Sequence, residues 1–335
     1  MKSRDVNFRQ RTFYSDKNIR KADYRVVTVF QYNLFGDEEE PIKISKTRNG
    51  KEKLTCPAKQ ILNDKKSEQY FELLLKGNFS ENDYVLRLSY SDKYLPATEE
   101  EAEENVKKYI RDLRKAAKKR GIEKLDYVYV TETGSRNGRI HHHMVLKNVL
   151  PRDLVEDLWS KQVRPFHPER ERLGWANVKR IQIAGPEMKG DGPDFMKRIA
   201  RYLVKRVRQS AGKRRWKQST GLVLPGTTKT DHVCTKKQFE QMSLFEGTSF
   251  EVSNTEMMKF IKKHHKDFVV TELRRDYNDL TGQFYIRFEL MRRNVWLRAH
   301  SIFSDQQLAQ MDMADEYLLP RKRKRNQEEI QGRLW

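Results

Sequence analysis

Alternating apolar and polar residues predict an antiparallel sheet in the middle of this chain. One strand is expected from Tyr84 to Tyr90, where every second residue is apolar or aromatic and shares one face. Two more are expected over 125–133 and 139–146, and the Asn137-Gly138 pair between them is typical of a tight hairpin. A short strand is expected at 178–183.

Apolar residues at helical spacing predict helices between and after these strands. Thr98 stands three residues before Glu101, a capping-box arrangement, and Gly121 is placed to end the helix that starts there. A second helix is expected after Pro151 and a third over 195–209, with a stripe of Ile199, Tyr202, Leu203 and Val207. The order predicts an α+β fold, in which helices flank an antiparallel sheet.

The character of the sequence changes twice along the chain, which suggests three parts. Residues 1–66 are charged and turn-rich and contain one expected strand, so we interpret them as a β-rich N-terminal extension. Residues 67–225 hold the regular pattern described above and form the expected central domain. Residues 226–335 are expected to form an additional C-terminal α/β module, with a helix, a hairpin and a basic tail at 321–325.

Composition narrows the class of partner. The formal net charge of +21 and the sequence pI of about 9.8 favour a polyanion such as nucleic acid. No apolar run reaches the roughly 20 residues of a membrane span, and the first residues lack the apolar core of a signal peptide. Cys56 and Cys234 are far apart and form no zinc motif, so we expect a cytoplasmic protein without disulfides.

The stretch GRIHHHMVL carries the first candidate chemistry. On a strand, His141 and His143 share a face, whereas His142 points to the other face. If residues 135–138 form a four-residue loop, Glu132 lies directly across from His141; a loop of three or five residues would turn Glu132 to the other face. Two imidazoles and a carboxylate suit Mg²⁺ or Mn²⁺ when a substrate adds phosphate oxygens, and zinc is also compatible. Alternatively, the histidines are ordinary polar strand residues.

The second candidate group lies on the basic helix. Tyr202 and Lys205 are three residues apart, so both side chains could address one phosphate, with Tyr202 as the nucleophile. Alternatively, Tyr202 packs in the core with its apolar neighbours. No acidic residue occurs over 195–226. The candidate DNA-binding residues of this stretch are Arg198, Arg201, Arg206, Arg208, Lys213, Arg214, Arg215, Trp216 and Lys217. A basic helix that is merely solvated is the alternative.

Three motifs in order, YVLRLSYSDKYLP, GRIHHHMVL and YLVK, carry a family resemblance. Over residues 60–225 the chain resembles HUH-type rolling-circle replication initiators (Rep) of bacterial plasmids, phages and integrated elements, and has the look of a Firmicute representative. The resemblance implies a ferredoxin-like nuclease fold. It also implies a metal-dependent endonuclease that nicks one DNA strand at an origin, forms a 5′-phosphotyrosine link and leaves a 3′-hydroxyl.

The resemblance also implies roles for single residues. His141 and His143 would be metal ligands with Glu132 as the third, Tyr202 the nucleophile, and Lys205 a group that positions the phosphate. Arg206 stands four residues after Tyr202, so the second tyrosine of two-tyrosine members is missing and a second subunit of an oligomer would have to supply it. The chain has no GxxxxGK[ST] stretch, so we expect a host helicase and polymerase as partners.

Two other functions are compatible with the same residues. A relaxase or a single-tyrosine transposase would make the same nick in a different DNA. A non-catalytic DNA-binding protein of this fold would bind DNA without cleaving it. Formation of a covalent adduct at Tyr202 distinguishes the enzymes from the binding protein.

Overall fold

The protein consists of two compact units, each built on a five-stranded antiparallel sheet. Residues 1–67 and 224–335 belong to the first unit, and residues 68–223 form the second. The α+β class with antiparallel sheets flanked by helices is therefore confirmed. The computed structural model describes residues 7–32, 57–80, 82–134, 138–163, 168–181, 195–206, 215–243, 255–278 and 282–299.

The second unit has the β-α-β-β-α-β order of a ferredoxin-like fold. Its five-stranded sheet has the order β8-β3-β5-β4-β9, and all neighbouring strands are antiparallel. The elements in chain order are α1 (Pro57–Asn78, whose second half lies in this unit), β3 (Tyr84–Ser89), η1 (Asp92–Tyr94), α2 (Glu99–Lys118), β4 (Tyr127–Thr133), β5 (Ile140–Leu146), α3 (Arg152–Asp157), β6 (Ser160–Gln162), β7 (Arg170–Arg172), β8 (Ala176–Arg180), α4 (Phe195–Arg206) and β9 (Lys217–Gln218).

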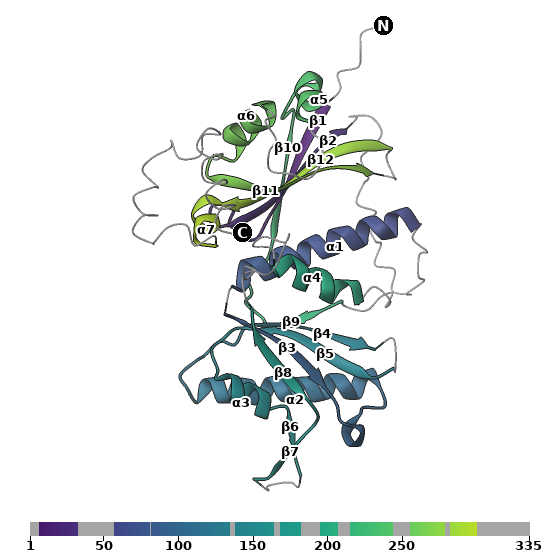
Figure 1. Ribbon diagram of the computed structural model, residues 1–335, viewed down its shortest axis with the longest axis vertical. Helices are drawn as coiled ribbons and strands as arrows, with labels where there is room; N and C mark the ends of the chain where they lie inside the picture. The colour runs from purple at the N-terminus through teal and green to yellow at the C-terminus, as the bar shows by residue number, and fades with distance from the viewer. Residues whose placement is uncertain are drawn as a thin grey trace, which may run out of the picture. The chain divides into compact units, whose positions relative to one another are not determined.

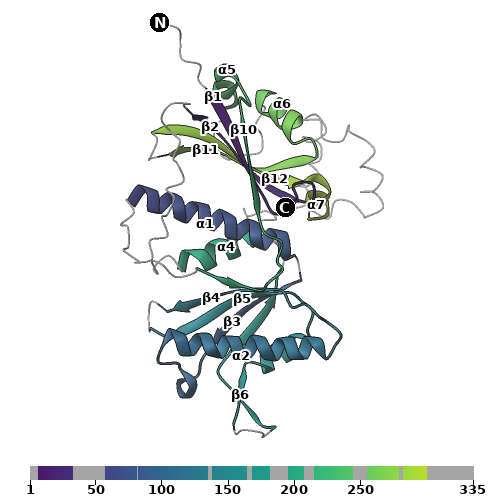
Figure 2. The ribbon, with the colours of Figure 1, turned by 180° about the vertical axis from the view of Figure 1, so that it is seen from behind.

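Helices cover both faces of this sheet (Figures 1 and 2). On one face, the apolar stripe of α2, which includes Val106 and Leu113, packs with α3 against the strands. The expected alternation of β3 is confirmed, because Tyr84, Leu86, Leu88 and Tyr90 are all buried in this core. In both views α4 lies over the opposite face. The odd-numbered residues of β5 point to that face.

The ends of α2 follow the sequence signals. The Thr98 side chain accepts a hydrogen bond from the Glu101 N–H at 3.2 Å, and the Glu101 carboxylate accepts one from the Ala97 N–H at 3.0 Å. Gly121 has a φ of +74°, which favours glycine after a helix end. The helix after Pro151 is shorter than expected: it ends at Asp157, and Trp159 is buried just beyond it.

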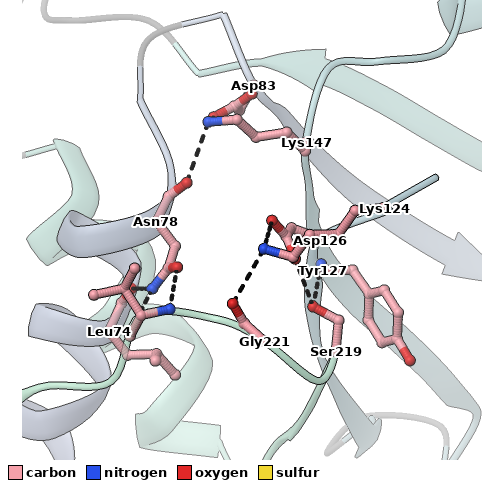
Figure 3. Close-up of polar contacts among 10 residues, drawn as sticks. Leu74, Asn78, Asp83, Lys124, Asp126, Tyr127, Lys147, Ser219 and Gly221 are labelled. Carbon is pink, nitrogen blue, oxygen red and sulfur yellow. Dashed lines mark hydrogen bonds and ion pairs between the residues drawn. The ribbon is translucent and has the colours of Figure 1, made fainter. Parts of the chain in front are cut away.

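A polar network fastens the segment that follows α4 to the rest of its unit (Figure 3). The Asn78 side chain donates to the Leu74 and Val223 carbonyls and accepts from the Val223 N–H, each at 2.8 Å. The Ser219 hydroxyl accepts from the Tyr127 N–H at 3.2 Å, which ties this segment to β4. The chain on either side of β9 is thus held by both α1 and the sheet.

The first unit brings together the two ends of the chain. Its sheet has the order β10-β1-β2-β12-β11, so strands from the N-terminal segment pair with strands from the C-terminal segment. Its elements are β1 (Asn7–Tyr14), β2 (Tyr24–Tyr32), β10 (Gly226–Asp231), α5 (Lys236–Ser243), α6 (Thr255–His264), β11 (Phe268–Asn278), β12 (Gln283–Arg292) and α7 (Arg293–Ala299).

One face of this sheet forms a core with two helices. Met242 of α5 and Met257 and Phe260 of α6 cluster with sheet residues that include Val29 and Phe288. The basic run at 321–325 lies outside the described residues. Among the described helices, none combines the length and apolar character that a membrane span requires.

Candidate metal centre

The register of the β4–β5 hairpin is the one expected from its sequence. Glu132 pairs with His141, and Val130 pairs with His143. The Gly134 N–H donates to the Arg139 carbonyl at 2.9 Å, which closes the ladder where a four-residue loop requires it. Residues 135–137 lie outside the described residues, but the register on both sides confirms that Glu132 shares a face with the two histidines.

Glu132, His141 and His143 converge at one point on the α4 side of the sheet. One carboxylate oxygen, Oε2 of Glu132, lies 3.3 Å from Nε2 of each histidine. One candidate ligand atom from each residue lies within 4.8 Å of the others. All three side chains are almost fully buried, so the cluster sits at the base of the α4-covered face.

The donor set of this cluster fits a metal ion. Nδ1 of His141 lies 3.2 Å from the Arg139 carbonyl, which can only accept, so Nδ1 carries the proton and Nε2 is an acceptor. Nε2 of His141 is buried and has no hydrogen-bond partner in the described part of the chain. Ligands on an octahedral ion with bonds of ~2.1 Å are about 3 Å apart, close to the observed spacing. The cluster could therefore bind a cation.

The middle histidine has a structural role on the other face. The Thr131 hydroxyl donates to Glu103 at 2.7 Å, so it accepts from Nδ1 of His142 at 3.0 Å. Nε2 of His142 then accepts from the Tyr90 hydroxyl at 2.8 Å. Burial lowers the pKa of His142 to about 3, so this imidazole is neutral and locks β5 against β3 and β4.

Helix α4 brings Tyr202 to the cluster. Its neighbours Ile199, Ala200 and Leu203 are buried, whereas Tyr202 is 42% exposed. The Tyr202 ring stands edge-on to His143, with the ring centroids 5.1 Å apart and the planes at 90°. The side chain therefore does not pack in the core with the apolar stripe on which the sequence placed it. It borders the cluster and is open to solvent.

The other candidate residues of the basic stretch have different surroundings. Trp216 packs against Tyr70 and Phe71 of α1, and Lys217 forms an ion pair with Glu103 at 2.5 Å. Arg201 is exposed, 3.5 Å from Glu68, and Arg215 is partly buried. Lys205, Arg198 and Arg206 lie in α4, but their side chains are outside the described residues, as are Arg208, Lys213 and Arg214 entirely.

The ion pair of Lys217 affects the α2 side of the sheet. Burial raises the pKa of Glu103, but hydrogen bonds from Lys217, Thr131 and Tyr129 outweigh it and the net pKa is lowered. Glu103 is therefore ionised and holds the Thr131 hydroxyl in the orientation that His142 needs. Within the described residues, Lys217 thus has a partner in its own unit.

Two exposed residues beside the cluster were missed by the sequence reasoning. Arg87 of β3 pairs in register with His143, and Trp175 lies at the start of β8. Arg87 alternates with Leu86 and Leu88, so the pairing of β3 with β5 would have revealed it. Trp175 follows Gly174 in a stretch without clear periodicity, and no local signal marks it.

A comparison with known families matches the part of the chain that contains this site. Residues 83–211 match a family model of replication-associated proteins, described as replication-associated protein ORF2. The match supports a replication-associated protein. It spans all four residues discussed above, Glu132, His141, His143 and Tyr202, and it implies binding to DNA. Searches of curated proteins and of solved structures give no significant match.

Proposed function

We propose that this protein is a metal-dependent endonuclease that nicks one DNA strand at an origin and thereby initiates rolling-circle replication. The observation that carries the proposal is the position of Tyr202, exposed and edge-on to His143 beside Glu132 and His141. A tyrosine next to a metal-binding cluster is suited to phosphoryl transfer, because the phosphate can be activated where the hydroxyl attacks. The replication-associated family match agrees with this chemistry.

The proposed reaction is a transesterification. The Tyr202 hydroxyl attacks a backbone phosphorus and loses its proton, and a phosphotyrosine bond to the 5′ side forms. The bond from phosphorus to the 3′ oxygen breaks, and that oxygen takes up a proton to leave a free 3′-hydroxyl. No energy-rich cofactor is consumed, because one phosphodiester replaces another. The reverse attack by a 3′-hydroxyl rejoins the strand.

The other residues bind and orient the reacting groups. Glu132, His141 and His143 hold the divalent cation, Mg²⁺ or Mn²⁺, which when bound polarises a phosphoryl oxygen. The Arg139 carbonyl fixes the tautomer of His141 so that Nε2 faces the cation. Lys205 lies one helical turn after Tyr202, and we propose that it positions the same phosphate.

The remaining parts of the proposal concern partners. The basic residues of the stretch from Arg198 to Lys217 would contact the backbone of melted origin DNA. A host helicase would unwind the duplex and a host polymerase would extend the 3′-hydroxyl, both in the bacterial cytoplasm. Since Arg206 replaces a second tyrosine, a second copy of the chain would supply the tyrosine that ends a replication cycle.

A covalent trapping experiment tests the proposal. The wild type is incubated with Mn²⁺ and a pool of single-stranded DNA of random sequence, and adducts are recovered under denaturing conditions. We expect an adduct with DNA attached to Tyr202, identified by mass spectrometry, and sequencing of the attached strands gives the preferred site. The Tyr202→Phe variant should form none, whereas Tyr277→Phe, which changes another exposed tyrosine, should react like the wild type.

Absence of the adduct would overturn the proposal. If the wild type forms no adduct with this pool or with melted plasmid origins, the protein is not a tyrosine nuclease. Normal DNA binding without an adduct would instead favour a non-catalytic DNA-binding protein of the same fold.

A further inference from the structure

One tryptophan of the second unit is unusually exposed. Trp175 is 79% exposed, the largest fraction among the exposed large hydrophobic side chains of the described residues. In contrast, Trp159 is buried in the core, and Trp216 packs against α1. An indole in water is costly to keep, and such residues are typical of binding surfaces.

The backbone places Trp175 in line with the metal cluster. The Ser89 N–H donates to the Trp175 carbonyl at 2.9 Å, so the two residues lie side by side. Ser89 pairs with His141, and His141 pairs with Glu132. A single row across the sheet therefore leads from the exposed indole to the cluster.

Alternation along β8 assigns the next residues to the same face. Val178 is buried in the core with Leu86, so Asn177 and Lys179 point to the opposite face, and both are exposed. Trp175 precedes Asn177 by two residues and continues this face. The face is the one that carries His141 and His143.

Arg87 forms the second row. It pairs with His143 on one side and with Asn177 on the other, and it is exposed. Leu86 and Leu88 on either side of it are fully buried on the α2 side, so Arg87 belongs to the face of the cluster. A cation thus stands directly beside one of the candidate ligands.

The charges of this surface are not neutralised within the protein. In the described part of the chain, no hydrogen bond or ion pair engages the side chains of Arg87 and Lys179, and no carboxylate lies on this face of β3 or β8. Nearby basic residues differ, because Arg172 pairs with Asp157 and Arg170 pairs with Asp112. Uncompensated cations beside an exposed indole are complementary to phosphates beside an unpaired base.

We propose that Trp175, Arg87, Asn177 and Lys179, here called the β3–β8 platform, bind single-stranded DNA adjacent to the cluster. Trp175 stacks on an unpaired base, and Arg87 binds a backbone phosphate. The identification of this DNA as the strand to be cut rests on the proposed function. The binding itself does not depend on cleavage, and it excludes a duplex because paired bases offer no free face to the indole.

The test measures binding without chemistry. In a Tyr202→Phe background, fluorescence anisotropy with a labelled single-stranded oligodeoxynucleotide gives the affinity. The Trp175→Ala change should weaken binding about 5- to 100-fold, the range that base stacking on an aromatic side chain gives. Trp175→Phe should restore most of the affinity. Tyr277→Ala, which removes an exposed aromatic ring from the first unit, should have no effect.

Two further measurements separate stacking from charge. The affinity for a duplex of the same sequence should be unchanged by Trp175→Ala. The Arg87→Gln change should reduce the slope of log affinity against log salt by about 0.7, the value for one phosphate contact on a single strand. An equal loss of single-strand and duplex affinity would overturn the assignment of stacking.

The outcomes distinguish this inference from the proposed function. If the wild type forms adducts and Trp175→Ala binds single strands as tightly as its parent, the platform is wrong and the nuclease stands. If the wild type forms no adduct but Trp175→Ala loses affinity, the platform stands and the nuclease is wrong. Unchanged melting temperatures confirm that the variants are folded, as expected for an exposed side chain.

Discussion

Glu132 and His141 face each other directly across the β4–β5 hairpin, with Oε2 of the carboxylate 3.3 Å from Nε2 of the imidazole. Both strands are fixed in register by the turn and by neighbouring strands. The same oxygen lies equally close to His143. A carboxylate and two imidazoles are thus held in place on a rigid sheet before any cation binds, which favours tight and specific binding.

Removal of one ligand should separate metal binding from DNA binding. We expect His143→Ala and Glu132→Gln to abolish Mn²⁺ binding, measured by calorimetry, and to abolish adduct formation. The salt-dependent DNA affinity should largely remain, because the basic residues supply most of it.

The exposed His232→Ala variant is the control for the loss of an imidazole, and it should bind Mn²⁺ like the wild type. An equal loss of DNA affinity and metal affinity in His143→Ala would contradict the assignment and make His143 a structural residue.

The hydrogen bonds of His142 should stabilise the second unit. The His142→Ala change removes a buried imidazole and leaves the hydroxyls of Tyr90 and Thr131 without their partner, so we expect a loss of about 2–4 kcal/mol in the free energy of unfolding. Tyr90→Phe removes one hydrogen bond and should cost about 1 kcal/mol. Urea unfolding followed by tryptophan fluorescence measures both.

Tyr94→Phe provides the comparison, because the Tyr94 hydroxyl bonds to the surface residue Glu171. Its loss should be within about 0.5 kcal/mol. A His142→Ala variant as stable as Tyr94→Phe would show that the network does not stabilise the fold.

Stability of the first unit should fall in mild acid because of His265. Burial, with a smaller effect of Arg25, lowers the pKa of His265 to about 3 from its ordinary value of 6.5. Between these pH values the unfolded chain binds a proton that the folded chain excludes, so stability decreases as pH falls from 6.5 towards 3. At a pH of about 5 the loss is about 2 kcal/mol.

Urea unfolding at a series of pH values measures this slope. The His265→Gln change should remove about this much of the acid sensitivity, whereas His232→Gln at an exposed site should leave it unchanged. An identical pH profile for the His265→Gln variant would contradict the assignment.

The cap of α2 should contribute measurably to stability. Thr98→Ala removes the acceptor for the Glu101 N–H, and we expect a loss of about 1 kcal/mol. Thr98→Asp retains an acceptor and should restore the stability. Thermal unfolding measures both, and a Thr98→Asp variant as unstable as Thr98→Ala would show that the hydrogen bond is not the cause.

The sequence predicted the parts of this protein that depend on neighbours along the chain. The period-two pattern of β3 identified its buried face, and the Asn137-Gly138 turn set a register that brings Glu132 opposite His141. Strands joined by a tight turn have only a few pairings, so local sequence is sufficient to choose among them. The Glu132, His141 and His143 cluster was predictable for this reason.

Tertiary structure alone decided the rest. Tyr202 is distant in sequence from His143, and only the packing of α4 on the sheet brings their rings to 5.1 Å and leaves Tyr202 exposed. Likewise, β2 pairs with β12 across most of the chain length, and Trp175 reaches the row of the cluster through β3. Such long-range pairings depend on which strand edges and apolar faces complete each other in space, and no local period or turn encodes that choice.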